Sequence, residues 1–345
     1  MTEPPIETRI ARRRERLHIA LGTECNNNCI FCVEADRAGR RIANAAMTPE
    51  RVRSILEAHR DAEEVCFTSG EPTTRPDLPS LVRLARELGF GTVSLMTNGR
   101  RLAYPGYAAA LAAAGITRLC ISIHGHEPRL HDGMTRTPGS FVQTLAGLEQ
   151  AARLRSVGVE LHSSTVVTSR NLPTLLELVR FLRARGVDEI VLNVMQPTGR
   201  AEQHFARLFP RYRDIVVAFA AMLAALGEPH PRVFLVDVPL CATEGLPDFN
   251  RGFVERQFHY ELRRDARPEP ATATALSPLE RVSRDDLDRA ERRKRAECSA
   301  CRYEPICEGV WRIYLEQYGW EELVPVAPAG GPPAGGPLDT PPTGR

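Results

Sequence analysis

In the stretch Cys25-Asn26-Asn27-Asn28-Cys29-Ile30-Phe31-Cys32, three cysteines follow the spacing CxxxCxxC directly after an alternating run at 17–24 that predicts a strand. Three thiolates this close on one loop can wrap a single soft metal centre, and a cube of four irons held by only three of them keeps one iron without a protein ligand. Zinc is the simpler alternative, although zinc sites usually add a second cysteine or histidine pair. An odd number of cysteines without an export signal argues against a disulfide.

Strand and helix signals then alternate along the chain. The first helix has Thr48 at its N-cap and Pro49 at its first position. Because parallel strands need long crossovers, six such repeats predict an α/β fold, an open partial (β/α)6 TIM-like barrel, whose chemistry lies at the carboxyl ends of the strands. We expect strands at 17–24, 64–68, 92–96, 118–123, 160–167 and 189–194, and helices at 47–60, 77–88, 106–114, 140–157 and 172–185.

Three motifs in this order resemble those of the radical S-adenosylmethionine (SAM) superfamily. The cysteine stretch matches CxxxCxΦC, with Phe31 as the aromatic residue. Ser69-Gly70-Glu71-Pro72, after the second strand, resembles the family's GGEP with serine in place of the first glycine. Thr97-Asn98-Gly99, after the third strand, resembles its TNG. The resemblance implies a 4Fe-4S cluster on Cys25, Cys29 and Cys32 and SAM as cofactor, in the same partial barrel.

The resemblance also implies which residues surround SAM. The turn of Ser69, Gly70, Glu71 and Pro72 contacts its amino group, with Glu71 at the family's acidic position; Thr97 and Asn98 lie near its carboxylate. Alternation places Ser164 on one face with His162 and Val166, and the family's fifth strand suggests that Ser164 touches the ribose, with Ser122 as the parallel candidate. Both hydroxyls could equally satisfy local backbone. Met195 to Pro197 could line the adenine pocket.

Two further groups have less specific readings. His124, His126, His131 and Asp132 form a polar loop after the fourth strand, for which we expect structural or substrate-facing roles ahead of metal binding. Cys66 and Cys120 lie inside predicted strands, where cysteine usually behaves as a small buried apolar residue.

The C-terminal third brings a second group of cysteines. After a strand at 233–238 we expect a loop or mobile insertion at 245–277 and a solvated helix between Pro278 and Glu297, followed by a short aromatic helix between Gly309 and Tyr318. The spacing CxxCx5C can gather three thiolates and leave Cys241 as a fourth ligand. This group resembles a Twitch or SPASM auxiliary-cluster extension, although Trp311 stands where the full SPASM pattern continues with cysteine; a four-thiolate zinc site is the alternative. The ligands of the second 4Fe-4S cluster would be Cys241, Cys298, Cys301 and Cys307.

The domain organisation follows from these segments. We expect an N-terminal flank at 1–16, the radical SAM barrel at 17–230, an auxiliary-cluster domain at 231–324 and a disordered Pro/Gly-rich tail at 325–345. A net charge of +2 over 345 residues gives no reason to expect a nucleic-acid partner. No apolar run is long enough for a membrane span, and nine cysteines without an export signal favour the cytoplasm.

The resemblance implies an enzyme that reductively cleaves SAM to a 5′-deoxyadenosyl radical, with flavodoxin or ferredoxin as electron donor. A ribosomally made peptide is the first choice of substrate, although a first strand near residue 17 leaves no room for an N-terminal peptide-recognition domain. The alternative is a small-molecule dehydrogenase or epimerase that acts on a sugar or natural product. A reactive thiol at Cys66, Cys120 or Cys241 would favour the epimerase. A non-catalytic iron–sulfur or zinc sensor is the third possibility.

Overall fold

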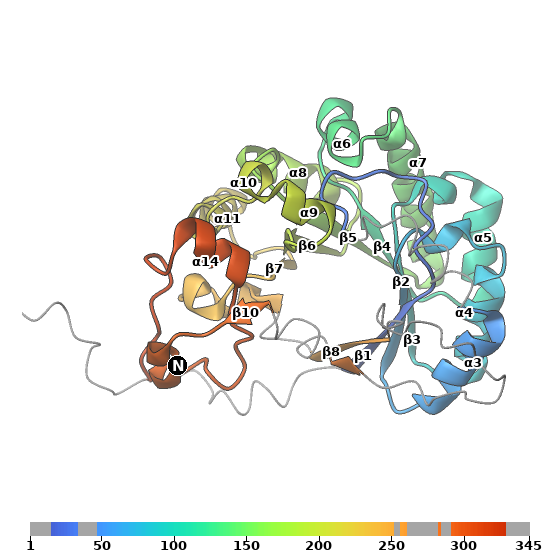
Figure 1. Cartoon of the computed structure of the whole chain (residues 1–345). Coiled ribbons are helices and arrows are strands. Elements are labelled where there is room, and N and C mark those ends of the chain that lie inside the picture. Colours follow the sequence, from blue (N-terminus) through green and yellow to red (C-terminus); the bar gives the residue numbers. More distant parts are fainter. Residues whose placement is uncertain (1–14, 34–46, 252–255, 261–281, 284–290, 329–345) are drawn as a thin grey trace, which may run out of the picture.

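The computed structural model describes residues 15–33, 47–251, 256–260, 282–283 and 291–328. Its main sheet has nine strands in the order β7-β6-β5-β4-β3-β2-β1-β8-β9. The first seven are parallel and curl into a half-barrel (Figure 1). The strands are β1 (Glu15–Ala20), β2 (Glu64–Thr68), β3 (Thr92–Thr97), β4 (Arg118–Ser122), β5 (Glu160–Val167), β6 (Glu189–Val194), β7 (Val233–Val236), β8 (Arg256–Tyr260) and β9 (Val282–Ser283).

The helices cover the convex face of this sheet (Figure 1), as right-handed crossovers between parallel strands require. The fold expected from the sequence, a partial α/β barrel, is therefore confirmed. The helices are α3 (Pro49–Ala58), α4 (Leu78–Glu87), α5 (Pro105–Ala114), α6 (Pro128–Thr135), α7 (Ser140–Arg153), α8 (Leu175–Arg183), α9 (Arg200–Gln203), α10 (Phe205–Leu208), α11 (Tyr212–Leu226) and α14 (Arg312–Tyr318).

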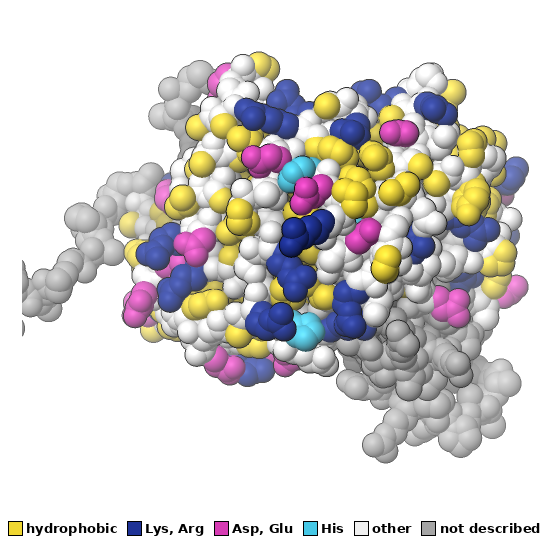
Figure 2. Space-filling model, turned by 90° about the horizontal axis from the view of Figure 1, so that it is seen from above, with side chains coloured by type: hydrophobic (Ala, Val, Ile, Leu, Met, Phe, Trp, Pro, Cys, Tyr) yellow, Lys and Arg dark blue, Asp and Glu magenta, His cyan; other side chains and the backbone are white. Residues whose placement is uncertain are grey.

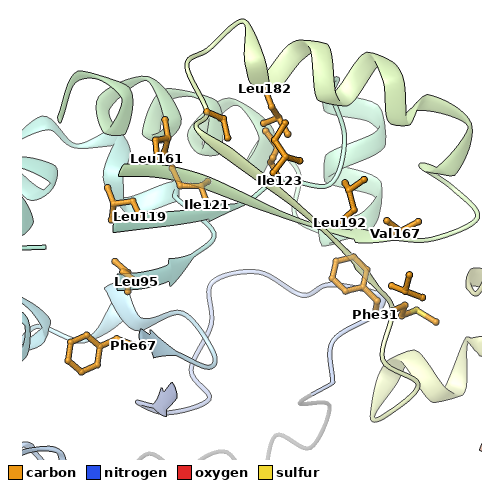
Figure 3. Close-up of a cluster of buried hydrophobic side chains, with 14 of the residues drawn as sticks. Phe31, Phe67, Leu95, Leu119, Ile121, Ile123, Leu161, Val167, Leu182 and Leu192 are labelled. Atoms are coloured by element: carbon orange, nitrogen blue, oxygen red, sulfur yellow. The ribbon is translucent and has the colours of Figure 1, made fainter. Parts of the chain in front are cut away.

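The barrel strands from β1 to β5 have a largely apolar outer face and a largely polar inner face. Residues of the outer face, such as Leu95, Leu119 and Leu161, are fully buried among the helices (Figure 3). Their neighbours in sequence point into the concave side, where His162 and Ser164 line a cavity. Since side chains alternate along a strand, one period-2 pattern builds both the hydrophobic core and the site.

The aromatic helix expected between Gly309 and Tyr318 is α14, preceded by a short ladder of β10 (Arg292–Arg293) and β11 (Val310–Trp311). Its Tyr314 packs on the rings of Phe209 and Tyr212, and the Tyr314 hydroxyl accepts the backbone N–H of Tyr212 at 3.2 Å. The C-terminal segment is thereby fixed to α10 and α11 of the barrel.

Three expectations were wrong in detail. The predicted loop at 245–277 contains β8, which pairs in parallel with β1. The free edge of β1 makes this pairing possible. No local sequence pattern predicts the strand. The described parts of the helix expected between Pro278 and Glu297 are β9, β10 and the start of a 3₁₀ turn. The polar loop at 124–132 includes the start of α6, which Pro128 at its first position signals.

One more expected strand belongs to the barrel sheet, and some expectations concern residues outside those that the structure describes. The strand expected at 233–238 is β7, which pairs with β6 and so extends the barrel sheet. The N-terminal flank up to residue 14, residues 261–281 and the tail from residue 329 lie outside the described residues.

Candidate active site

The concave face of the sheet encloses a cavity of about 450 Å³. It extends from charged residues at the first positions of the strands to the loops at their carboxyl ends. Among the residues expected to form the site, Glu71 and Pro72 are not part of the cavity wall, and neither are the four C-terminal cysteines. The wall does include Cys25, Cys29, Phe31, Cys32, Ser69, Gly70, Thr97, Asn98, Ser122, Ser164 and Met195.

The three cysteines of the loop after β1 influence one another electrostatically. The pKa of the Cys29 thiol is raised to about 12. Burial is the largest cause and Cys25 and Cys32 add to it, whereas Arg200 acts in the opposite direction. The backbone N–H of Asn27 donates to Cys25 Sγ at 3.4 Å. Cys29, whose ionised form is disfavoured by burial and by the two neighbouring thiols, belongs to a donor set whose thiolates a cationic centre would stabilise. Within the described part of the chain, no group of three or more His, Cys, Asp or Glu side chains meets the spacing of a single-ion site.

The cysteine loop is held by two elements far away in sequence. The N–H groups of Asn28 and Ile30 donate to the carbonyls of Thr135 and Met134, at the end of α6, at 3.0 and 2.9 Å. On the other side, the N–H of Arg200, at the start of α9, donates to the Cys32 carbonyl at 2.9 Å. These contacts use the unpaired carbonyls of one helix end and the unpaired N–H groups of another.

The turn after β2 is shaped by two residues in the left-handed region of backbone conformation. Ser69 has φ of 73° and Gly70 has φ of 56°. A Cβ at Gly70 would lie 2.5 Å from the Glu24 carbonyl oxygen, so only glycine allows this approach to the loop after β1. The N–H of Glu71 then donates to the same carbonyl at 2.7 Å.

Glu71 supports this turn from behind the cavity wall. Its carboxylate accepts the Thr73 hydroxyl at 2.6 Å, the Thr97 hydroxyl at 2.6 Å and the Asn98 backbone N–H at 2.6 Å. Burial raises its pKa, and these hydrogen bonds act against that rise. The side chain expected at the SAM amino group thus joins the ends of β2 and β3.

Ser122 and Ser164 lie side by side on β4 and β5, in register, and both face the cavity. Ser164 Oγ accepts from the Asn193 Nδ2 group on β6 at 2.6 Å. His162 and Val166 line the cavity on the same face, as the alternation along β5 predicts. Three neighbouring strands thus present hydroxyl and amide groups to the same part of the cavity.

Two histidines that follow β4, His124 and His131, are buried. His124 Nδ1 accepts the Val166 N–H at 3.2 Å, and its ring packs edge-on to Phe31 with centroids 4.8 Å apart. His131 Nδ1 accepts the His124 N–H at 3.1 Å. Burial first and then His131 lower the pKa of His124 well below its usual value, so this imidazole is neutral at pH 7 and carries its proton on Nε2.

Cys66 and Cys120, expected to be small buried apolar residues, are shielded from solvent and also line the cavity. Both sit on the inner face of their strands. Burial raises the pKa of the Cys120 thiol to about 12, and Cys66 adds to this rise, so both remain protonated.

A belt of charges at the amino-terminal end of the barrel was missed by the sequence analysis. Glu64 pairs with Arg16 at 2.8 Å and with Arg118 at 2.5 Å. Glu189 is paired with Arg251 and lies 3.3 Å from His162. Several strands begin with a charged residue in an inward position, a signal available in the sequence.

The four C-terminal cysteines gather outside the cavity. The pKa of the Cys241 thiol is raised to about 12. Burial is the largest cause, followed by the neighbouring Cys307, Cys301 and Cys298. The backbone N–H of Gly309 donates to Cys307 Sγ at 3.4 Å, and that of Val326 to Cys301 Sγ at 3.3 Å. Segments 60 or so residues apart in sequence thus bring thiols within electrostatic range of one another.

Comparison with known proteins identifies the class. Residues 19–182 match the family model described as Radical SAM superfamily. Residues 19–182 are therefore a radical SAM domain, and members of this superfamily use a 4Fe-4S cluster and SAM. Among the described helices, none combines the length and the apolarity needed to cross a membrane.

Two curated relatives and one solved structure show the range of similar proteins. The chain is 29% identical over 197 residues to a probable GTP 3′,8-cyclase of Sulfolobus acidocaldarius, a match that covers 56% of this chain and 60% of the relative. It is 32% identical over 187 residues to an AdoMet-dependent heme synthase of Methanosarcina barkeri, covering 52% of this chain and 50% of the relative. The match thus spans only half to three fifths of these relatives. Streptococcus suis SuiB bound to its precursor peptide SuiA superposes with a TM-score of 0.62 at 17% identity, covering 90% of this chain and 76% of SuiB, which shows a shared fold.

Proposed function

We propose that this chain is a radical SAM enzyme that holds a 4Fe-4S cluster on Cys25, Cys29 and Cys32 and abstracts hydrogen from a ribosomally made peptide. The observation that carries this proposal is the position of the three cysteines in the wall of one cavity, together with the turn at Ser69 and the end of β3 at Thr97. When bound, the cluster and SAM supply the 5′-deoxyadenosyl radical.

The residues around the cavity fit an adenosyl ligand. Ser122, Ser164 and Asn193 offer hydroxyl and amide groups to the same part of the cavity, suited to a ribose, and Thr97 and Asn98 lie beside the cysteine loop, suited to an amino-acid end. Met195 and Phe31 add apolar surface for a base. The role of the protein is to orient these groups and to exclude water from the radical.

The peptide substrate is supported by the fold. SuiB, whose structure contains a bound precursor peptide, has a TM-score of 0.62 with this chain. Flavodoxin or ferredoxin is the proposed electron donor.

A second 4Fe-4S cluster on Cys241, Cys298, Cys301 and Cys307 is part of the proposal. Its support is the mutual electrostatic influence of the four thiols and the two backbone N–H groups that already donate to Cys301 and Cys307. Backbone N–H groups that donate to sulfur are typical of iron–sulfur ligands. A four-thiolate zinc site is the alternative, and metal analysis distinguishes the two.

One observation favours a second function, a small-molecule epimerase. Cys120 lies in the cavity wall two positions before Ser122 on the same strand, and it is protonated. A neutral thiol in this position could return a hydrogen atom to a substrate radical. Replacing Cys120 by serine separates the two proposals, because only a redox-neutral reaction would stop.

The test uses the reconstituted, anaerobic protein with SAM and reductant. We expect 5′-deoxyadenosine, and we expect its yield to rise in the presence of a short peptide encoded beside the gene, which then carries a change in mass. Formation of 5′-deoxyadenosine without any peptide response would contradict the peptide substrate. The absence of 5′-deoxyadenosine and of SAM binding would contradict the enzymatic function.

A further inference from the structure

Arg100 is connected to the sulfur of Cys25 through a single peptide group. The Arg100 Nη1 group donates to the Asn26 carbonyl oxygen and, at 3.0 Å, to Asn27 Oδ1. The N–H of the same Asn26–Asn27 peptide donates to Cys25 Sγ at 3.4 Å. In a trans peptide the carbonyl and the N–H point in opposite directions. The guanidinium and the sulfur therefore sit at opposite ends of one dipole, each at the end that it stabilises.

Within the described ranges, the partners of the Arg100 guanidinium are neutral groups. Its Nε donates to Gln143 Oε1, a neutral amide on α7, at 2.6 Å, and among the residues that the structure describes no carboxylate pairs with it. In the charge belt, by contrast, Arg118 is paired with two glutamates. Arg100 is also absent from the cavity wall, so it is placed to act on the cysteine loop rather than on SAM or substrate. Figure 2 shows the molecule from above, and several Lys and Arg side chains are grouped at the middle of the face in view.

Arg200, the other guanidinium that holds this loop, differs in its connection. Its Nη1 donates to the carbonyls of Asn28, at 3.0 Å, and Cys29. The N–H of the Cys29–Ile30 peptide is directed to the Met134 carbonyl of α6, at 2.9 Å. This peptide therefore ends on a helix and not on a sulfur.

We propose that Arg100 is a positioning residue that makes the cluster on Cys25, Cys29 and Cys32 easier to reduce, by polarising the peptide whose N–H donates to Cys25 Sγ. Reduction adds negative charge to a cluster and its sulfurs, and both N–H···S hydrogen bonds and nearby cations stabilise that charge. The inference rests on the cluster assignment proposed above, and it adds a residue that controls how readily the cluster accepts its electron.

The first test is an anaerobic redox titration of the reconstituted protein, following the electron paramagnetic resonance signal that SAM alters. Because SAM binds only one of the two proposed clusters, this signal reports the cluster on the loop. We expect Arg100→Gln to lower the ratio of reduced to oxidised cluster about tenfold at a fixed potential, which is about 59 mV for one electron. The control is Arg101→Gln, which removes a neighbouring charge bound to the Thr73 carbonyl; it should leave the midpoint unchanged.

A second pair of variants keeps the guanidinium in place. Gln143→Glu gives Arg100 a carboxylate partner and should lower the midpoint in the same direction. Gln150→Glu adds the same charge further along α7, where the side chain contacts Arg153, and should have no effect. If Arg100→Gln fails to load iron, this pair decides the question.

The outcomes separate the two proposals. Midpoints of Arg100→Gln and Gln143→Glu equal to that of the wild type, with the cluster loaded, would overturn the role of Arg100 alone. A wild-type protein without any SAM-sensitive signal would overturn the cluster assignment itself.

Discussion

The hydroxyl of Thr97 donates to Glu71 Oε1 at 2.6 Å and thereby joins the turn after β2 to the end of β3. The other carboxylate oxygen, Oε2, accepts the Asn98 N–H, also at 2.6 Å. One buried carboxylate thus fixes two of the loops that face the cysteines. This relationship explains how residues of separate βα units are held at one site.

Glu71→Gln tests this role. The amide replaces one acceptor oxygen with a donor that faces other donors, so we expect a loss of about 2 kcal/mol in the free energy of unfolding. We also expect weaker binding of S-adenosylhomocysteine, measured by calorimetry, because Thr97 and Asn98 lose their common anchor. The control is Glu50→Gln, at an exposed position on α3. Unchanged stability and affinity in Glu71→Gln would contradict the proposed role.

Ser69→Gly tests the strain in the turn. Serine at φ of 73° occupies a conformation that costs an L-residue about 1 kcal/mol, whereas glycine adopts it freely. We expect the variant to be more stable by up to this amount, as measured by chemical denaturation. Lower stability would mean that the serine side chain contributes more than the strain costs.

Gly199→Ala tests the contact between α9 and the cysteine loop. A Cβ at this position would lie 2.2 Å from the Val33 carbonyl oxygen, and φ is 60°. We expect the loop to be displaced and the iron content after reconstitution to fall. Gly106→Ala, on α5 with no atom within 4 Å of the added Cβ, should keep full iron content and gain about 0.5 kcal/mol. Equal iron content in both variants would contradict the tight fit at Gly199.

Glu189 makes stability depend on pH. Burial alone would raise its pKa, but the hydrogen bond from His162 and the charge of Arg251 outweigh burial and lower it well below the usual 4.5. A carboxylate with a lowered pKa in the folded state stabilises the fold above its unfolded pKa, and this stabilisation is lost as the pH falls below about 4.5. We expect Glu189→Gln to cost about 3 kcal/mol at pH 7, because it leaves a buried guanidinium without its partner.

The measurement is denaturant unfolding of wild type and Glu189→Gln at several pH values. The difference between the two should be constant from pH 8 to about 5.5 and should narrow below about pH 4.5. A difference that does not depend on pH would show that the charge of Glu189 is not what stabilises the belt.

The sequence predicted the barrel well because its signals are local. The alternation along β5 and the helix cap at Thr48 each require only a few neighbouring residues. The three cysteines and the turns at Ser69 and Thr97 could be placed together because the carboxyl ends of parallel strands meet at one edge.

What the sequence could not predict depends on contacts between distant segments. The pairing of β8 with the edge of β1, and the ion pairs that join Glu64 to Arg118, are decided by which strands become neighbours. The link from Arg100 to Cys25 crosses 75 residues and passes through the backbone, where side-chain patterns carry no information.

The most direct test of the central claim is the iron content and electron paramagnetic resonance spectrum of wild type and of Cys25→Ala/Cys29→Ala/Cys32→Ala, both reconstituted anaerobically. We predict about eight irons per chain in the wild type, about four in the variant, and a SAM-sensitive signal and 5′-deoxyadenosine only in the wild type. Equal iron content and an equal response to SAM in both proteins would contradict the account.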